Sequence, residues 1–141
     1  MRQMLALLST LLLAGCEGHN EVIEPGTLSS PVSVGLHRGQ AYRVTGTGLT
    51  ARFDSVTSDS RCPQGAMCIW AGDGATRISI FSDWHDAVTC TLHTTLSPQQ
   101  VATDGYSFRL SQLLPYPRVA GPIDPSAYIA VLTIASIPPR Q

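Results

Sequence analysis

The sequence predicts an all-β protein, either an antiparallel β-sandwich of about seven strands or a small barrel. Three observations lead to this prediction. Apolar and polar residues alternate with a period of two in several short segments, as in half-buried antiparallel strands. Glycine, proline, aspartate or serine residues separate these segments at short intervals. No segment carries the sustained 3.6-residue repeat of apolar positions that an amphipathic helix needs.

The predicted strands follow one another from residue 32 to residue 134. Two short segments come first, and segments with clearer alternation follow; at 49–54, for example, apolar residues occupy every second position. The last segment is apolar on both faces, which is typical of a central strand. One short helical turn is expected within 97–102, after Pro98. The seven predicted strands are residues 32–37, 40–45, 49–54, 77–80, 88–93, 106–111 and 128–134.

The N-terminal segment has the organisation of a bacterial lipoprotein leader. Arg2 supplies a positive charge, residues 4–14 are mainly apolar, and Leu13-Ala14-Gly15-Cys16 closes the segment. The apolar part is shorter than the roughly 20 residues of a membrane-spanning helix. Its last four residues resemble the lipobox, in which the cysteine is acylated and the preceding peptide removed; the alternative is an ordinary secretory peptide cleaved nearby. We therefore predict a lipoprotein signal peptide at 1–15, a flexible lipidated tether at 16–31 and one β-domain at 32–138.

The predicted lipid anchor indicates a location in the bacterial cell envelope. Acyl chains on Cys16 would insert into a membrane, and two or three of them hold a protein there almost permanently, since each buried methylene contributes about 0.8 kcal/mol. The next residue is Glu17. In enteric-type sorting an aspartate at that position marks retention at the inner membrane, so the sequence favours the outer membrane.

Charge and composition exclude several classes of function. The 141 residues contain nine arginines, no lysine and ten acidic residues, and removal of residues 1–15 leaves a net charge near −2. No basic patch is present, so nucleic acid is not an expected partner. The absence of lysine excludes Schiff-base chemistry and the lysine of a phosphate-binding loop.

The segment 59–75 is the distinctive part of the domain, because it carries two closely spaced cysteines. With Cys16 lipidated, three cysteines remain and three pairings are open. In an oxidising compartment the local choice is Cys62 with Cys68. We expect Trp70 to pack beneath the resulting loop with its indole N–H bonded to the backbone, and Cys90 to be a buried, inert thiol on a strand.

A redox or metal-handling role is the alternative for these cysteines. Five residues separate Cys62 from Cys68, whereas two separate the cysteines of a thioredoxin-type site. Soft sulfur ligands suit Cu(I), but Cys90 and His93 are three positions apart and so point to opposite faces of a strand. We expect no metal or other cofactor. The other candidate ligands are Met67 and His85, and periplasmic thiol-redox or metal handling through Cys62, Cys68 and Cys90 stays as the alternative function.

The segment 59–75 resembles a motif, roughly S-R-C-P-x-x-x-x-C-x-W-x-G-x-A, of small uncharacterised bacterial secreted proteins and lipoproteins. Leu-Leu-Pro-Tyr-Pro at 113–117, followed by Tyr128, is similar to the same family, and the resemblance spans residues 47–134. The family implies no activity or ligand for this chain. The sequence departs from the motif at 72–75, Gly-Asp-Gly-Ala, where an acidic residue usually leads directly into alanine. That difference predicts a looser turn before the next strand.

No group of residues predicts a catalytic site. The sequence has no G-x-S-x-G elbow, and Asp83-Trp84-His85-Asp86 is typical of a hairpin turn. A hydrolase whose residues come from distant strands stays open as a third hypothesis. We expect a non-catalytic binding or accessory module for an envelope partner, with its function on loops at one end of the domain. The candidate binding residues are Arg61, Met67, Trp70 and Tyr116, within 61–70 and 115–125; the second segment is alternatively a plain crossover between sheets.

Overall fold

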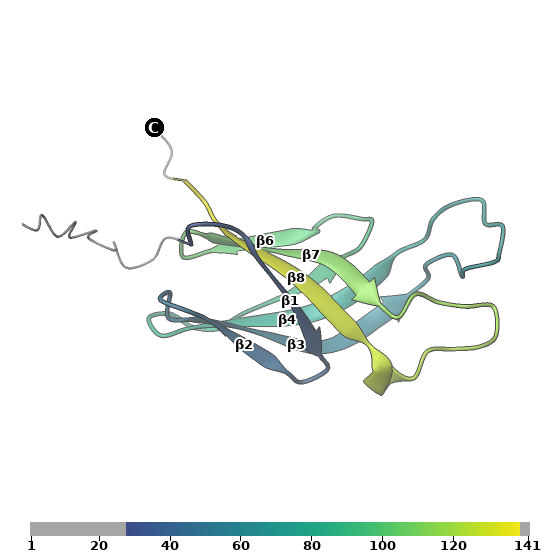
Figure 1. The fold of residues 1–141 in the computed structure, drawn as a ribbon, viewed down its shortest axis with the longest axis horizontal. Helices are drawn as coiled ribbons and strands as arrows, with labels where there is room; N and C mark the ends of the chain where they lie inside the picture. Colours follow the sequence, from purple (N-terminus) through teal and green to yellow (C-terminus); the bar gives the residue numbers. More distant parts are fainter. Residues whose placement is uncertain (1–27, 139–141) are drawn as a thin grey trace, which may run out of the picture.

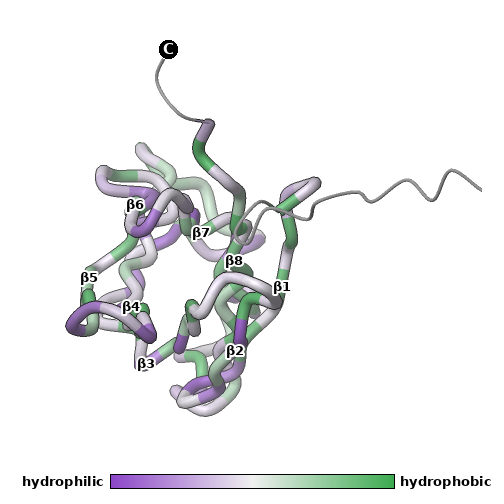
Figure 2. The backbone as a smooth tube through the Cα atoms, turned by 90° about the vertical axis from the view of Figure 1, so that its left-hand side faces the viewer, coloured by the Kyte–Doolittle hydropathy of each residue, from purple (hydrophilic) through white to green (hydrophobic). Residues whose placement is uncertain are grey.

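The computed structural model of the protein describes residues 28–138. Within them, eight strands form two antiparallel sheets that pack face to face (Figures 1 and 2). The strand order is β1-β8-β7-β6 in one sheet and β2-β3-β4-β5 in the other. The elements are β1 (Val32–His37), β2 (Ala41–Val44), β3 (Leu49–Asp59), β4 (Gly74–Ser82), β5 (Val88–His93), β6 (Gln100–Thr103), β7 (Tyr106–Leu114), the short 3-10 helix η1 (Pro125–Ala127) and β8 (Ile129–Ser136).

The predicted fold class is confirmed, and of its two forms the sandwich is the one observed, because the strands form two separate four-stranded sheets. Each of the seven predicted strands overlaps an observed one. The expected helical turn at 97–102 is wrong, because β6 occupies Gln100–Thr103 and pairs with β7. Asp104 and Gly105 connect these strands with φ values of 50° and 79°, the positive values that a two-residue hairpin turn of type I′ requires.

The core lies between the sheets and is built from alternate residues of the strands. Phe53 of β3 and Phe108 of β7 are fully buried and come from opposite sheets. Complete burial of such a side chain contributes about 1.5–3 kcal/mol. β8 pairs with β1 on one side and β7 on the other, which confirms it as a central strand. Other core residues include Leu36, Val44, Leu49, Ile78, Ile80, Leu92, Leu110, Leu132 and Ile134.

The two ends of the sandwich differ in what they carry. The described chain starts and finishes at the same end, which we call the proximal end (left in Figure 1). The β1–β2, β3–β4, β5–β6 and β7–β8 connections lie at the opposite end, which we call the distal end (Figure 1). None of the helices in the described part of the chain has the length and apolar character needed to cross a bilayer. The predicted lipidation site, Cys16, lies outside the described residues.

Candidate functional site at the distal end

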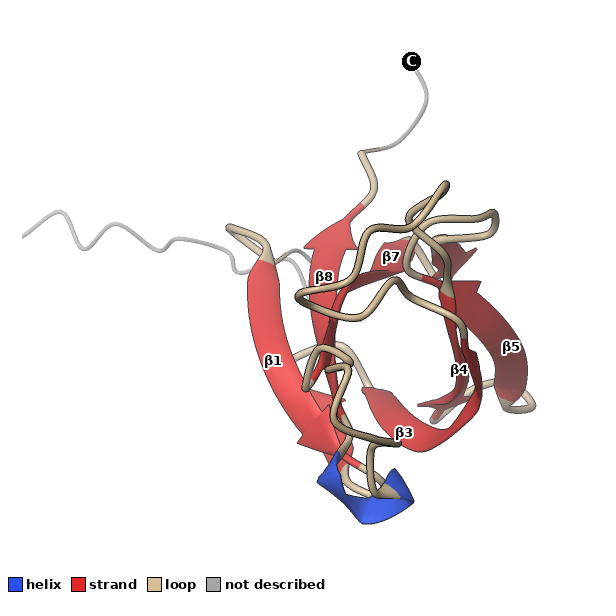
Figure 3. Cartoon of the chain, turned by 90° about the vertical axis from the view of Figure 1, so that its right-hand side faces the viewer, coloured by secondary structure: helices blue, strands red, loops and turns tan. Residues whose placement is uncertain are grey.

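Long connections from both sheets meet at the distal end. Residues 60–73 join β3 to β4 within one sheet, and residues 115–128 join β7 to β8 within the other. The backbone N–H of Gln64 donates to the carbonyl of Pro117 at 2.8 Å and links the two connections. Figure 3 looks onto this end and shows the loops crossing in front of the strands. The distal end is therefore one continuous surface formed by loops from both sheets.

A buried ion pair stands at the base of this surface. Asp59 ends β3, and Arg61 follows two residues later, so both side chains lie on one side of the chain. The Arg61 guanidinium donates from Nε to Asp59 Oδ1 at 2.8 Å and from Nη2 to Oδ2 at 2.7 Å. Tyr128, just before β8, donates its hydroxyl to Asp59 Oδ2 at 2.9 Å. The cluster thus connects the two sheets.

Arg61 also holds the chain that follows β7. Its guanidinium donates to the carbonyls of Leu113 and of Pro115, the latter at 3.0 Å, and lies 4.9 Å from the centre of the Tyr116 ring. The side chain is buried, with 5% of its residue surface exposed. The expectation that Arg61 lies on the surface is therefore wrong, and its binding role stays a prediction. An arginine is rarely buried without partners, and here a carboxylate and two carbonyls satisfy it.

The partners of Asp59 set its protonation and that of Tyr128. Burial by itself would raise the pKa of Asp59, but hydrogen bonds from Arg61 and Tyr128 outweigh that effect and lower it. For Tyr128, burial and the adjacent Asp59 carboxylate raise the pKa to about 12. The carboxylate stays charged and the phenol stays protonated at neutral pH. This arrangement stabilises structure and leaves no group poised to exchange a proton.

A second carboxylate, that of Asp73, binds the chain just before β4 to the end of β5 and the residues after it. Asp73 Oδ2 lies 2.6 Å from His93 Nδ1, and its Oδ1 accepts from the backbone N–H groups of Thr95 at 2.9 Å and Leu96 at 3.2 Å. Burial acts to raise the pKa of Asp73, but these hydrogen bonds lower it overall. Asp73 itself is buried, and β4 begins at the next residue. The predicted loose turn at 72–75 is therefore wrong, because Asp73 is tightly hydrogen-bonded to the β5–β6 connection.

The disulfide between Cys62 and Cys68 is present, with 5.9 Å between the two Cα atoms. It closes a loop whose two arms are joined by a hydrogen bond from the Cys62 N–H to the Ala71 carbonyl, at 2.8 Å. We call residues 62–72 the tip loop. A further hydrogen bond joins Ser60 to Asp73 at 2.7 Å, directly below it. The tip loop is therefore a stapled extension of the β3–β4 hairpin.

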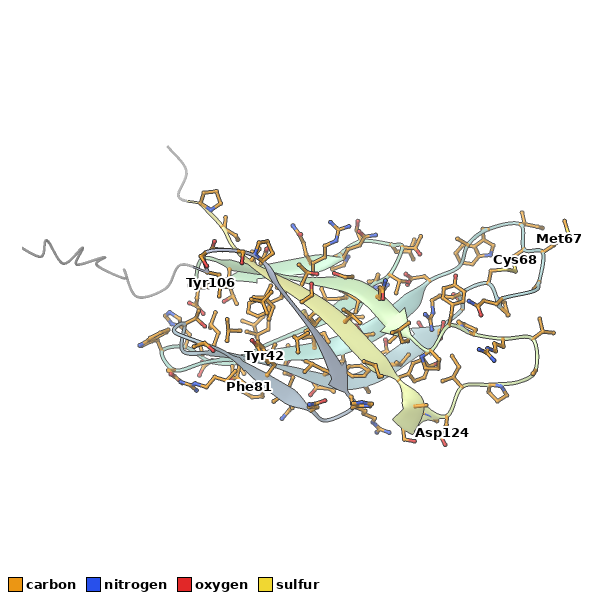
Figure 4. The ribbon with its side chains drawn as sticks, viewed as in Figure 1. Tyr42, Met67, Cys68, Phe81, Tyr106 and Asp124 are labelled. Carbon is orange, nitrogen blue, oxygen red and sulfur yellow. A yellow bond between two sulfur atoms is a disulfide. The ribbon has the colours of Figure 1, made fainter. Side chains whose placement is uncertain are left out.

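Apolar side chains cover the outside of the tip loop. Met67 and Ile69 are each 105% exposed, Trp70 is 61% exposed and Tyr116 is 40% exposed. The expectation that Trp70 packs beneath the loop is wrong, because the loop projects beyond the sheets and offers it no cover. Val119, from the β7–β8 connection, is 69% exposed and approaches Gly65. We call Met67, Ile69, Trp70 and Val119 the apolar tip; Figure 4 labels Met67 at its outer edge.

A cavity of about 580 Å³ lies between the end of β3 and the β7–β8 connection, and Pro63 at the base of the tip loop borders it. Prolines at 63, 117, 122 and 125 contribute to its walls, and the Asp59–Arg61–Tyr128 cluster contributes to its lining. Arg38 and Arg118 also line it, and both are exposed. The cavity therefore presents two solvent-facing guanidinium groups on a frame of rigid residues.

The cysteines and histidines of the described residues are spread over the molecule. Cys90 is partly buried and pairs with Ile78 of β4. Ile78 lies four residues, or about 13 Å, from Gly74, where β4 begins beside the tip loop. Burial raises the pKa of the Cys90 thiol. His85 lies at the proximal end, 3.3 Å from Asp104, whereas Met67 lies at the distal end. Within residues 28–138, no three histidine, cysteine or acidic side chains are grouped closely enough to share a metal ion.

Comparison with known proteins adds no family or relative: no family model, no curated protein and no solved structure matches the chain. The candidate site therefore stands on its own geometry. Of the residues singled out in the sequence, the structure brings Met67, Trp70 and Tyr116 to the distal surface and places Arg61 below it. Arg118 and Val119 lie within the candidate segment 115–125, but the sequence did not single them out, since nothing local to this segment shows that it meets the tip loop.

Proposed function

We propose that the chain is a lipid-anchored protein of the bacterial cell envelope whose β-sandwich is a non-catalytic binding or accessory module. In this proposal acyl chains on Cys16 hold it to a membrane, with the outer membrane favoured, and the distal end contacts the partner. The lipobox resemblance of residues 13–16 supports the anchor. The exposed apolar tip, which lies at the opposite end from the start of the described chain, supports the binding role.

The apolar tip is the observation that carries the binding role. Single exposed apolar residues are common on protein surfaces and need no explanation. Here, however, two fully exposed aliphatic side chains lie next to an exposed tryptophan on one stapled loop, and Val119 adds to them from a second loop. Exposed apolar side chains gathered on neighbouring loops are typical of sites of interaction with proteins, ligands or membranes.

The buried polar clusters support a structural role for the remaining ionisable groups. Asp59, Arg61 and Tyr128 satisfy one another, and Asp73 is satisfied by His93 and two backbone N–H groups. Within the described residues, no hydrogen bond joins a histidine to a serine, threonine or cysteine side chain. These clusters hold the loops in place, which is what a pre-formed binding surface requires.

Two measurements test the proposal, one on protein purified from its own envelope and one in intact cells. Intact mass spectrometry with and without thiol alkylation should show acyl mass on Cys16, one disulfide and one alkylated cysteine. Three reactive thiols or a stoichiometric metal would instead favour the redox or metal-handling alternative. A photo-reactive amino acid in place of Met67 should give a specific cross-link in intact cells, whereas the same group in place of Trp84 at the proximal end should not. Equal labelling from both positions would contradict a distal binding surface.

A further inference from the structure

We propose that the distal end docks on an anionic phospholipid bilayer, with the tip loop entering the headgroup region. This inference rests on the binding role proposed above and names the partner of the same surface. Three features of the described residues support it: the shape of the tip loop, its lack of charge and the arginines at the same end. The number of residues between Cys16 and the described domain permits it.

The tip loop is a protrusion. Residues 64–71 are all exposed, and the 105% exposure of Met67 and Ile69 means that no neighbouring group covers either side chain. Figure 4 places Met67 and Cys68 at the outermost part of the distal end. A folded protein partner would need a matching pocket for such a protrusion. Lipid headgroups and acyl chains rearrange around an inserted loop, so a bilayer needs no preformed complement.

The composition of the tip loop suits the membrane interface. Its eleven residues, 62–72, carry no charged side chain. Ile69 and Met67 form the outermost apolar group, and Trp70 and Tyr116 are exposed beside it. Tryptophan and tyrosine are enriched at the headgroup level, where one part of the ring system is in contact with lipid and the polar group with water. Aliphatic side chains bury slightly deeper in such interfacial anchors.

Positive charge lies at the same end of the sandwich as this apolar group. Arg38 and Arg118 are exposed, line the cavity below the tip loop and form no ion pair with another described residue. Guanidinium groups in this position attract anionic headgroups. Of the acidic residues at this end, Asp59 pairs with Arg61 and Asp73 with His93, so that exposed Asp124, the cap of η1, is the one that faces the two arginines without an ion pair among the described residues. At the proximal end, Asp83 pairs with Arg43 and Asp104 with His85.

The chain between Cys16 and the described domain is long enough for this contact. Twelve residues lead from Cys16 to Leu28, and a fully extended chain of that length reaches about 40 Å at most. The longest strand, β3, has 11 residues and spans about 36 Å. Because the tip loop projects beyond β3, this reach allows the distal end to touch the bilayer that holds the acyl chains when the sandwich is tilted towards the membrane plane.

The test uses the two tryptophans of the chain, which lie at opposite ends of the sandwich. Full-chain lipidated protein is placed on vesicles of phosphatidylcholine and phosphatidylglycerol with brominated acyl chains, which quench tryptophans that enter the bilayer. Trp84→Phe leaves Trp70 as the reporter of the tip, and Trp70→Phe leaves Trp84 as the reporter of the proximal end. We expect several-fold stronger quenching of Trp70 than of Trp84, with the Trp70 emission moving to shorter wavelength. Quenching of Trp70 that does not exceed that of Trp84 overturns the proposal.

Flotation of the same vesicles reports separately on the anchor. If neither variant floats, the lipid anchor of the proposed function fails, whereas quenching of Trp70 still decides the insertion of the tip. Met67→Asp and Ile69→Asp should each abolish Trp70 quenching without affecting flotation, because neither side chain has packing contacts to lose. Ala87→Asp, which adds the same charge at an exposed proximal position, is the matched control and should quench normally.

A comparison of anionic with neutral vesicles tests whether the tip requires anionic lipid. On vesicles of phosphatidylcholine alone, Trp70 quenching should fall several-fold, and Arg118→Gln should lower it on anionic vesicles but not on neutral ones. Equal quenching on both vesicle types overturns the preference for anionic lipid. A shift of Trp70 emission that depends on protein concentration without vesicles identifies a second copy of the chain as the occupant and likewise overturns the proposal.

Discussion

The Arg61 guanidinium donates two hydrogen bonds to the Asp59 carboxylate, and the pair is almost completely withdrawn from solvent, with 4% and 10% of the two side chains exposed. The same guanidinium reaches two carbonyls 52 and 54 residues further along the chain. One side chain therefore fixes the end of β3, the start of the tip loop and the chain after β7.

Removal of Arg61 should cost much more stability than removal of an equally close but exposed arginine. Arg43 lies 2.7 Å from Asp83, the same separation as between Arg61 Nη2 and Asp59, but its side chain is 63% exposed. We expect Arg61→Met to lower the free energy of unfolding by about 3–5 kcal/mol, because it leaves Asp59 charged and unpaired. Arg43→Met should lower it by about 1 kcal/mol at most. Urea denaturation measures both; similar losses would mean that burial does not decide the strength of these pairs.

Two buried tyrosines differ in whether the hydroxyl has a partner. Tyr128 donates to Asp59 at 2.9 Å, whereas the buried hydroxyl of Tyr106 has no hydrogen-bond partner among the described residues. We expect Tyr128→Phe to reduce stability by about 1.5–3 kcal/mol, the range for a hydrogen bond to a charged group. Tyr106→Phe should leave stability unchanged or raise it by about 1 kcal/mol, since it removes an unsatisfied polar atom. A loss at Tyr106 as large as that at Tyr128 would reveal a partner for its hydroxyl.

Much of the fold follows from local pattern, whereas the site depends on distant contacts. Alternation predicts the strands at 49–54, 77–80, 88–93 and 106–111, because burying one face of a sheet imposes a period of two, and a run that is apolar on both faces predicts the central strand at 128–134. β6 was missed although Asp104-Gly105 is a hairpin signal, because its four residues are too short to show that period. The roles of Arg61 and Trp70 were misassigned for a different reason. Burial of Arg61 requires carbonyls more than 50 residues away, and exposure of Trp70 results from the projection of the tip loop.

The two buried carboxylates should make the protein less stable in acid. The pKa values of Asp59 and Asp73 lie below the usual 3.8 in the folded state, so the unfolded chain binds protons more readily. Their stabilising contribution is complete above the unfolded pKa and is lost as the pH falls from about 4 through the lower, folded pKa values. Urea denaturation between pH 7 and pH 2.5 should show this loss. Asp59→Asn and Asp73→Asn should each weaken the dependence of the unfolding free energy on pH. An unchanged pH dependence in both variants would contradict the lowered pKa values of these two residues.

Tyr128 should produce the opposite dependence in alkali. Its pKa is raised from 10.0 to about 12, so its contribution to stability is complete below pH 10 and is lost as the pH rises towards 12. Ultraviolet titration of the phenols should show one group ionising near the upper end of this range in the wild-type protein. That late ionisation should be missing in Tyr128→Phe and retained in Tyr106→Phe. Its persistence without Tyr128 would assign it to another tyrosine.

Reduction of the disulfide should weaken the protein without unfolding the sheets. Closure of the seven-residue loop from Cys62 to Cys68 contributes about 2.4 kcal/mol by the chain-entropy relation. The backbone hydrogen bonds between the two arms of the tip loop do not depend on the sulfur atoms. We expect the reductant to lower the unfolding free energy by up to that amount and to leave the far-ultraviolet circular dichroism unchanged. Cys62→Ala combined with Cys68→Ala should behave like the reduced protein; a loss of β-signal in either would show that the staple is needed for folding.

Gly72 marks the closest approach of the two arms that carry the tip loop. Its φ is +71°, and a Cβ atom there would lie 1.9 Å from the carbonyl oxygen of Ser60. Gly72→Ala must therefore push the arms apart and strain the Ser60–Asp73 hydrogen bond of 2.7 Å.

We expect Gly72→Ala to cost about 3 kcal/mol or more, or to prevent folding. Gly39 provides the control, because it has a similar φ of +80° but open space around the added atom. Gly39→Ala should cost only the conformational penalty of about 1–2 kcal/mol. Equal losses in urea denaturation would show that backbone conformation alone, and not the contact with Ser60, requires a glycine at position 72. A larger loss at Gly72 would show that the spacing of the two arms, on which the position of the apolar tip depends, is set by that contact.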